Sequence, residues 1–422
     1  MASAPKQMPP LPSSEPRRPR WAQCLPAAVA FAVVTVVLVI GARRSIPPEN
    51  VCPDFIQFWT AATLLSSRQD PYDAALQAAV QQDLGWKRDE DGLGVYDFLP
   101  YYYPPWLGLA FVPLLPLGYP LAKLTWLVLG AEVVLVSAAL LAKTARGVSQ
   151  PLAIAVVGLF GFSIKAVAMG QLAPLVLLLL AIEWWLLERG RHREAGFVLA
   201  LLTMKPQLTL LLTIAVLLRA ARQRHWQLWR SFGVTLLLFV AASTIAWPGW
   251  LPSMLSATRI TPMPTHYYPG LGATWLVTLG AIGLSDFPLY LAYASIAVPL
   301  LLALLRMTQR ADARLEELFS LALLAPFFVA PYARPYDFPV LMIPALVLMG
   351  SRLGELARLL LAFALTALVG LHIIWLTANY VTPVVGLRRP EFSYFWIPML
   401  LGAFWLFHRG HGSRKGAPAN RS

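Results

Sequence analysis

The feature that most constrains this chain is a series of long apolar stretches separated by short polar loops. Residues 21–42 and residues 121–142 are two examples, and each is long enough to cross a hydrocarbon core of about 30 Å as a helix. Of the 422 residues, 58% are hydrophobic and only 13% are charged, whereas a soluble domain carries about a quarter charged residues. The sequence therefore predicts an all-α, polytopic membrane protein.

Lysine and arginine residues cluster in alternate loops, and this pattern predicts the orientation of the chain. Arg17, Arg18 and Arg20 precede the first apolar stretch, so the positive-inside rule predicts a cytoplasmic N-terminus. Further clusters with the same predicted location lie at residues 143–146, 189–193, 219–230, 306–314, 352–358 and 409–415. The alternation predicts about twelve crossings with both termini inside. We interpret the net charge of +13 as a topology signal and expect no nucleic-acid partner.

A single transmembrane domain, residues 21–408, is expected to make up nearly the whole chain. Residues 1–20, rich in proline, serine and basic residues, predict a disordered cytoplasmic tail, and residues 409–422 predict a second cytoplasmic tail. The first external loop, residues 43–100, holds nine of the 21 acidic residues and five basic ones. That balance is unlike a cytoplasmic segment.

Some apolar segments are too short or too interrupted to be simple spans. Residues 101–120 begin with three tyrosines and contain five prolines, which favours a short re-entrant or interfacial helix on the outer face. Residues 194–218 must enter and leave the membrane within 25 residues, with Lys205 and Pro206 at the bend. Because irregular backbone is not tolerated against lipid, this bend is expected to face protein or water.

A small set of polar and ionisable side chains is predicted to gather near the outer membrane face. Ionisable groups at membrane depth are costly and are usually functional. The set comprises Asp54, Lys165, Gln171, Lys205, His266, Arg334 and Asp337. Scattered structural ion pairs have no reason to share one leaflet, so this convergence predicts a functional site on the outer side.

Each of these side chains also has a simpler structural interpretation. Asp54 could cap the helix that follows it, and Lys205 could extend its amine to the membrane interface. Arg334 and Asp337 could pair with each other across a turn. Lys165 could anchor the end of a helix, Gln171 could be an amide at the start of a helix, and His266 could be an ordinary loop histidine.

The motifs that the sequence has and those that it lacks limit the classes of reaction that the chain can be expected to catalyse. The sequence has no G-x-S-x-G, no paired His and Cys, and no H-E-x-x-H, so we expect no nucleophile triad, no metal and no cofactor. Cationic side chains can grip a phosphate, and a carboxylate can take a proton from an attacking hydroxyl. This combination favours a reaction on a lipid-linked phosphate. Aromatic candidates for stacking on sugars or lining a lipid groove are Phe55, Phe58, Trp59, Tyr72, Tyr96 and Tyr101–Tyr103.

Several stretches in order carry a family resemblance. They are "PDFIQFWTAATLL" (residues 53–65), "DPYD" (70–73), "YYYPPW" (101–106), "GQLAPLVLLLLA" (170–181), "LLTMKPQLTLLL" (201–212) and "APYARPYDFPVL" (330–341). Their order resembles the polytopic glycosyltransferases of the GT-C class that use polyprenyl-phosphate sugars. Most closely it resembles glycosyltransferase family 87, which includes polyprenol-phosphate-mannose-dependent mannosyltransferases.

The resemblance implies a GT-C-like fold and a role for individual residues. It makes Asp54 the general base and Lys205 a candidate for binding the donor phosphate. Arg334 is a second candidate on its positive charge, and it departs from the family pattern, in which a smaller or His-type residue is expected at this place. Candidates for further substrate contacts are Tyr103, Gln171, His266, Tyr336 and Asp337. The implied donor is a polyprenyl-phosphate sugar, with mannose as the sugar, and the implied acceptor is a glycolipid or glycan hydroxyl. The implied location is a bacterial plasma membrane, with the active site on its outer face.

Two other classes of protein remain open on the sequence. A transporter or flippase of a lipid-linked glycan or small anion would suit proline-broken helices with a lysine at the bend, although no inverted repeat relates the two halves. A polymerase or ligase acting on a lipid diphosphate would be expected to carry more than one outer arginine and a large late external loop. Release of free polyprenyl phosphate would separate a transferase from a transporter.

Overall fold

The computed structural model describes residues 52–85, 98–145, 147–260, 272–310, 312–351, 354–380 and 391–414. These residues fall within one compact unit, Pro47–Ser422. Every regular element in these ranges is a helix, which confirms the predicted all-α class. The predicted tail at residues 1–20 and the predicted first span at residues 21–42 lie outside the described residues. At the other end, helix α20 (Trp396–Arg414) continues past residue 408, where the sequence predicted the last tail to begin.

Four helical stretches in these ranges are long and apolar enough to cross a membrane. They are α5 (Tyr119–Thr144), α11 (Trp226–Ala246), α14 (Asp286–Gln309) and the continuous stretch Glu355–Trp375. A fifth candidate is the pair α6 (Gln150–Leu159) and α7 (Gly161–Ala168), whose axes meet at 56°. Helix α5 contains the whole apolar stretch predicted at residues 121–142. The described helices thus support a membrane protein, and the count of about twelve crossings is not confirmed.

The remaining helices are shorter. They are α2 (Phe55–Ser66), α3 (Ala74–Asp83), α4 (Pro105–Phe111), η2 (Val112–Leu117), α8 (Ala173–Glu188), α9 (His192–Leu202), α10 (Pro206–Arg222), α12 (Trp250–Ile260), α13 (Trp275–Ala281), α15 (Leu315–Leu324), α16 (Pro326–Val329), η4 (Pro335–Leu341), α17 (Met342–Gly350), α18 (Glu355–Phe363), the π-helical turn η5 (Ala364–Leu368), α19 (Val369–Tyr380) and η6 (Glu391–Phe395). Helices α18 and η5 and the first part of α19, to Trp375, form the long stretch named above.

The two interrupted segments form short helices, as the sequence predicts. Residues 101–118 contain α4 and η2, neither of which is long enough to span a membrane, and α5 begins at Tyr119. Residues 194–218 form α9, a turn and α10, which begins with Pro206 at its first position, where a missing N–H costs nothing. The Thr209 hydroxyl donates to the Leu202 carbonyl at 2.7 Å, so the end of α9 stays satisfied across the bend.

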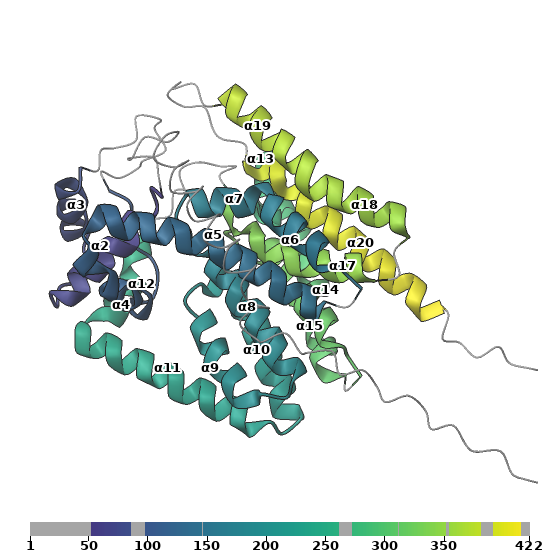
Figure 1. Cartoon of the computed structure of the whole chain (residues 1–422), viewed down its shortest axis with the longest axis horizontal. Helices are drawn as coiled ribbons and strands as arrows, with labels where there is room; N and C mark the ends of the chain where they lie inside the picture. Colours follow the sequence, from purple (N-terminus) through teal and green to yellow (C-terminus); the bar gives the residue numbers. More distant parts are fainter. Residues whose placement is uncertain are drawn as a thin grey trace, which may run out of the picture. The chain divides into compact units, whose positions relative to one another are not determined.

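The core lies where the central helices pack together. Helix α5 packs against α6 and α8, α9 packs against α11, and α15 packs against α17 (Figure 1). Leu177 of α8, Leu321 of α15 and Ile343 of α17 are fully buried in this core. By contrast, α11 exposes Leu237 and Ile245, with exposed fractions of 67% and 73%. Large apolar side chains on the outside of a long helix are expected where the surrounding solvent is lipid.

Candidate functional site

The site begins where the chain enters α2. The backbone N–H of Cys52 donates to the Ala168 carbonyl at 2.9 Å, and the N–H of Asp54 donates to the Met169 carbonyl at 3.0 Å. Gly170 follows with φ +73°, and a Cβ there would lie 2.9 Å from the Cys52 Cβ, so only glycine fits. These contacts join the segment before α2 to the turn between α7 and α8.

This junction brings Gln171 to Asp54. The Gln171 amide nitrogen donates a short hydrogen bond to Oδ2 of Asp54. Asp54 stands at the N-cap position of α2, yet its side chain makes no capping hydrogen bond, in contrast to the simplest structural interpretation of the sequence. Asp54 is partly exposed, and its side chain is oriented by Gln171. Among the described residues, no hydrogen bond is formed to its second oxygen, Oδ1, which can therefore accept from another partner.

A second pair lies at the bend between α9 and α10. Lys205 is fully buried, and its Nζ forms a short ion pair with Oδ1 of Asp337. Oδ2 of Asp337 accepts the backbone N–H of Arg334 at 3.0 Å, which closes the first turn of η4. Asp337 is therefore engaged on both oxygens, and it links the α9–α10 bend to η4.

Arg334 pairs with a residue that the sequence reasoning did not single out. Its Nη2 donates to Oε1 of Glu391 at 2.9 Å. Its Nε lies 2.6 Å from Oε2, an ion-pair contact whose angle is not that of a hydrogen bond. The simpler interpretation, in which the Arg334 and Asp337 side chains pair with each other, therefore does not hold, because Asp337 pairs with Lys205 and Arg334 pairs with Glu391. The one available signal was that Glu391 is the only acid in the predicted external turn at residues 378–392.

The Tyr336 ring lies beside both cations. Nζ of Lys205 lies 5.5 Å from the ring centroid, and the guanidinium carbon of Arg334 lies 5.4 Å from it. Contacts of this kind are attractive because the negative face of the ring meets the positive charge. Tyr336 thus helps to hold the two cations at defined positions, and its own side chain stays partly exposed.

The electrostatics of the site act on Asp54. Burial raises the pKa of Asp54 from 3.8 to about 6, which makes it a stronger base than an ordinary aspartate. The Gln171 hydrogen bond opposes this effect, as do the positive charges of Arg334, Lys205 and Lys165. Side chains from four separate segments therefore act together on a single carboxylate.

Tyr103 lies on the aromatic side of the site. Its ring contacts Phe58 at 5.5 Å and Tyr101 at 5.8 Å, and its carbonyl accepts the Tyr72 hydroxyl at 2.7 Å. Burial raises the pKa of the Tyr103 hydroxyl, and the charges of Asp337 and Asp54 raise it further. The ring is partly exposed, as a substrate contact requires.

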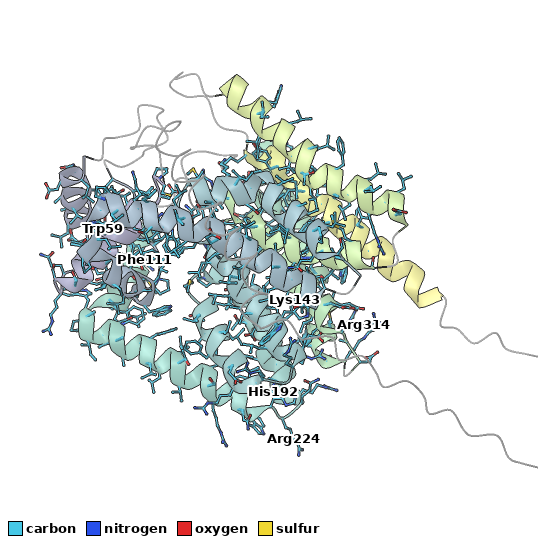
Figure 2. The ribbon with its side chains drawn as sticks, in the orientation of Figure 1. Trp59, Phe111, Lys143, His192, Arg224 and Arg314 are labelled. Atoms are coloured by element: carbon cyan, nitrogen blue, oxygen red, sulfur yellow. The ribbon has the colours of Figure 1, made fainter. Side chains whose placement is uncertain are left out.

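Most of the other aromatic candidates are core residues. Phe55, Phe58 and Tyr101 are fully buried, and Phe58 stacks on Phe111 at 5.1 Å. Figure 2 labels Trp59 and Phe111 within this aromatic cluster. The expectation that Phe55, Phe58 and Tyr101 offer their faces to sugars is therefore wrong, because these rings are buried beside other aromatic side chains. Tyr96 and the candidate His266 lie outside the described residues.

A separate cavity of about 350 Å³ lies near His192 and His225, whose rings stack at 3.7 Å. It is also lined by Glu188, Arg219 and Gln223. None of the residues that line it is among those that act on Asp54, so the cavity is separate from the site around Asp54. Among the described side chains, no group of three or more His, Cys, Asp or Glu could hold a metal ion. The prediction of a metal-free reaction stays a prediction.

The fold and the site define a helical membrane protein with a carboxylate among several cations. Comparison with known families is more specific: the model of glycosyltransferase family 87 matches residues 101–332, more than half of the chain. The chain therefore belongs to glycosyltransferase family 87. The matched region contains Tyr103, Gln171 and Lys205, whereas Asp54 and Arg334 lie outside it. No curated protein and no solved structure matches the chain.

Proposed function

We propose that the chain transfers a sugar, with inversion, from a polyprenyl phosphate to a hydroxyl of a glycolipid or glycan at the outer face of the membrane. Membership of glycosyltransferase family 87 makes it a glycosyltransferase. The observation that carries the finer proposal is the partly exposed Asp54, oriented by Gln171 and surrounded by the charges of Lys165, Lys205 and Arg334. The proposed sugar is mannose, on the resemblance described above.

In the proposed reaction, Asp54 acts as the general base. Its free oxygen, Oδ1, takes the proton of the acceptor hydroxyl while the acceptor oxygen bonds to the anomeric carbon. The bond between that carbon and the phosphate oxygen breaks, and the electron pair leaves with the phosphate. One displacement with one carboxylate inverts the anomeric centre. A positioned base contributes typically about 10²–10⁴-fold to the rate.

The cations are proposed to stabilise the departing phosphate, whose negative charge grows in the transition state. Arg334 is the better candidate for direct contact because its side chain is 16% exposed. Lys205 is fully buried against Asp337, so its part is to add positive potential and to hold the loop that carries Arg334. Lys165 of α7 adds a third positive charge on the side of Asp54.

The test is a transfer reaction with defined substrates. Purified protein in detergent is incubated with polyprenyl-phosphate-mannose and a panel of glycolipids, and products are identified by mass spectrometry. We expect release of free polyprenyl phosphate together with a mannosylated acceptor. Flipping or transport would leave the donor intact, and use of a lipid diphosphate in place of the monophosphate would favour the polymerase or ligase alternative.

The outer-face location has its own test. The basic residues Lys143, Arg224 and Arg314, all in predicted cytoplasmic clusters, lie away from Trp59 and Phe111 in Figure 2. We expect a cysteine placed at exposed position 83, in a background without the two natural cysteines, to react with an impermeant reagent added to intact cells. A cysteine at exposed position 223 should react only after lysis. The reverse labelling would overturn the proposed orientation.

A further inference from the structure

We propose that Glu391 is a positioning residue that holds the Arg334 guanidinium in place for the donor phosphate. This inference rests on the proposed function, and it adds a residue that lies outside the family match and outside every sequence stretch that carries the resemblance. Glu391 is almost completely buried, with an exposed side-chain fraction of 5%, and it is 57 residues away from Arg334 in the sequence.

The geometry of the pair leaves one edge of the guanidinium available. An arginine side chain carries five N–H donors in a planar fork, on Nε, Nη1 and Nη2. The Glu391 carboxylate lies along the side formed by Nε and Nη2. Within the described part of the chain, no hydrogen bond or ion pair is formed by Nη1. The end of the fork, formed by Nη1 and the second Nη2 hydrogen, can therefore donate to two oxygens of a phosphate.

The surroundings of Arg334 restrict the fork to this orientation. Its backbone is fixed by Asp337 through a hydrogen bond in each direction, at 3.0 and 2.9 Å. The Tyr336 ring lies beside its guanidinium carbon. Glu391 restrains the rest of the long side chain. Without this restraint the side chain would lose its rotamer freedom only when the donor binds, and that loss would oppose binding. An arginine that is oriented before binding can hold a phosphate monoester with two parallel hydrogen bonds, a geometry that lysine cannot provide.

The experiment measures phosphate binding and turnover separately. Binding of a short-chain polyprenyl phosphate is measured on the purified full-length protein, with the corresponding polyprenol as the probe without phosphate. We expect Glu391→Gln to weaken phosphate binding about tenfold or more, the size of one charge-assisted hydrogen bond, and to leave polyprenol binding unchanged. The KM for the sugar donor should rise, and the KM for the acceptor should stay the same.

A double-mutant cycle tests whether Glu391 acts through Arg334. In an Arg334→Ala background, Glu391→Gln should have almost no further effect on phosphate binding, because there is no guanidinium left to orient. Glu391→Asp should restore part of the binding. The matched control is Glu194→Gln, which neutralises the acid of the exposed Arg191–Glu194 pair and should change neither measurement.

Three outcomes would overturn the proposal. The first is unchanged phosphate binding in Glu391→Gln. The second is tighter phosphate binding in this variant, which would make Glu391 a competitor of the phosphate. The third is that Glu391→Gln and Arg334→Ala have additive effects on phosphate binding. Failure of the proposed function is distinguishable, because the wild type would then bind polyprenyl phosphate without transferring a sugar. If Glu391→Gln proves too unstable to purify, the Glu391→Asp variant carries the binding measurement.

Discussion

Replacing Asp54 by asparagine separates its effect on the rate from its effect on stability. Folding raises the pKa of Asp54 from 3.8 to about 6, so between these pH values the folded chain holds a proton that the unfolded chain has released. The stability contributed by this group is therefore greatest below pH 4 and falls as the pH rises through about 6. A tenfold change in an ionisation constant is worth about 1.4 kcal/mol, so ionisation of Asp54 costs the fold about 3 kcal/mol at neutral pH.

Asparagine keeps the shape of the side chain and an oxygen that can accept from Gln171, but it carries no charge. Because Asp54 is partly exposed, solvent recovers part of the ionisation cost, and we expect Asp54→Asn to be about 2 kcal/mol more stable than wild type at pH 7.5. The difference should shrink toward zero near pH 4. Turnover should fall at least about a hundredfold, since asparagine cannot accept the proton.

The assay pairs thermal unfolding in detergent at several pH values with single-turnover transfer. Asp73→Asn is the matched control, because exposed Asp73 caps α3 by accepting from the Leu76 N–H at 2.9 Å, and asparagine caps equally well. This control should change neither stability nor rate. An Asp54→Asn variant that retains near-wild-type turnover would refute the assignment of the base. A variant that is inactive and no more stable than wild type at pH 7.5 would refute the electrostatic reasoning.

The remaining predictions concern pH and the buried ion pair. The ratio kcat/KM should fall as the pH is lowered through about 6, where Asp54 gains a proton, and Gln171→Leu should move this fall to higher pH because its hydrogen bond favours the carboxylate. A pH profile without a group near 6, or one that Gln171→Leu leaves in place, would contradict this. Lys205→Met should destabilise the protein by about 3–5 kcal/mol, because it leaves the buried Asp337 carboxylate without its cation. Adding Asp337→Asn should restore most of the stability but not the donor affinity, and equal loss toward donor and acceptor would assign Lys205 a structural role alone.

Much of the fold class follows from local sequence properties. The apolar stretch at residues 121–142 has one stable form in lipid, a helix, because every backbone hydrogen bond must be made within the segment. The prolines of residues 104–116 likewise limit helix length, and only α4 and η2 form before α5 begins at Tyr119. The number of crossings is less accessible, since helices such as α8 and α10 are shorter than a full span and their extent depends on neighbours.

The sequence also predicted most side chains of the candidate site, but not their partners. Four of them are polar residues in apolar stretches of sequence: Asp54, Gln171, Lys205 and Asp337. Placing a polar side chain in such surroundings costs free energy, and this cost alone makes them candidates for function. Their partners lie far away in the sequence. Asp54 and Gln171 are 117 residues apart, and Lys205 and Asp337 are 132 residues apart. Short-range patterns carry no information on such distances.

Glu391 shows the same limit most clearly. In the sequence it is a single acid in a predicted external turn, with no periodicity or motif to distinguish it. Only the tertiary structure brings it to the Arg334 side chain, and this pairing leaves Asp337 to Lys205. Composition and periodicity indicate whether each segment prefers lipid, water or the protein interior, because this preference is the sum of the preferences of its single residues. Pairing of charges is a property of the three-dimensional arrangement, so the tertiary structure alone decides which carboxylate meets which cation.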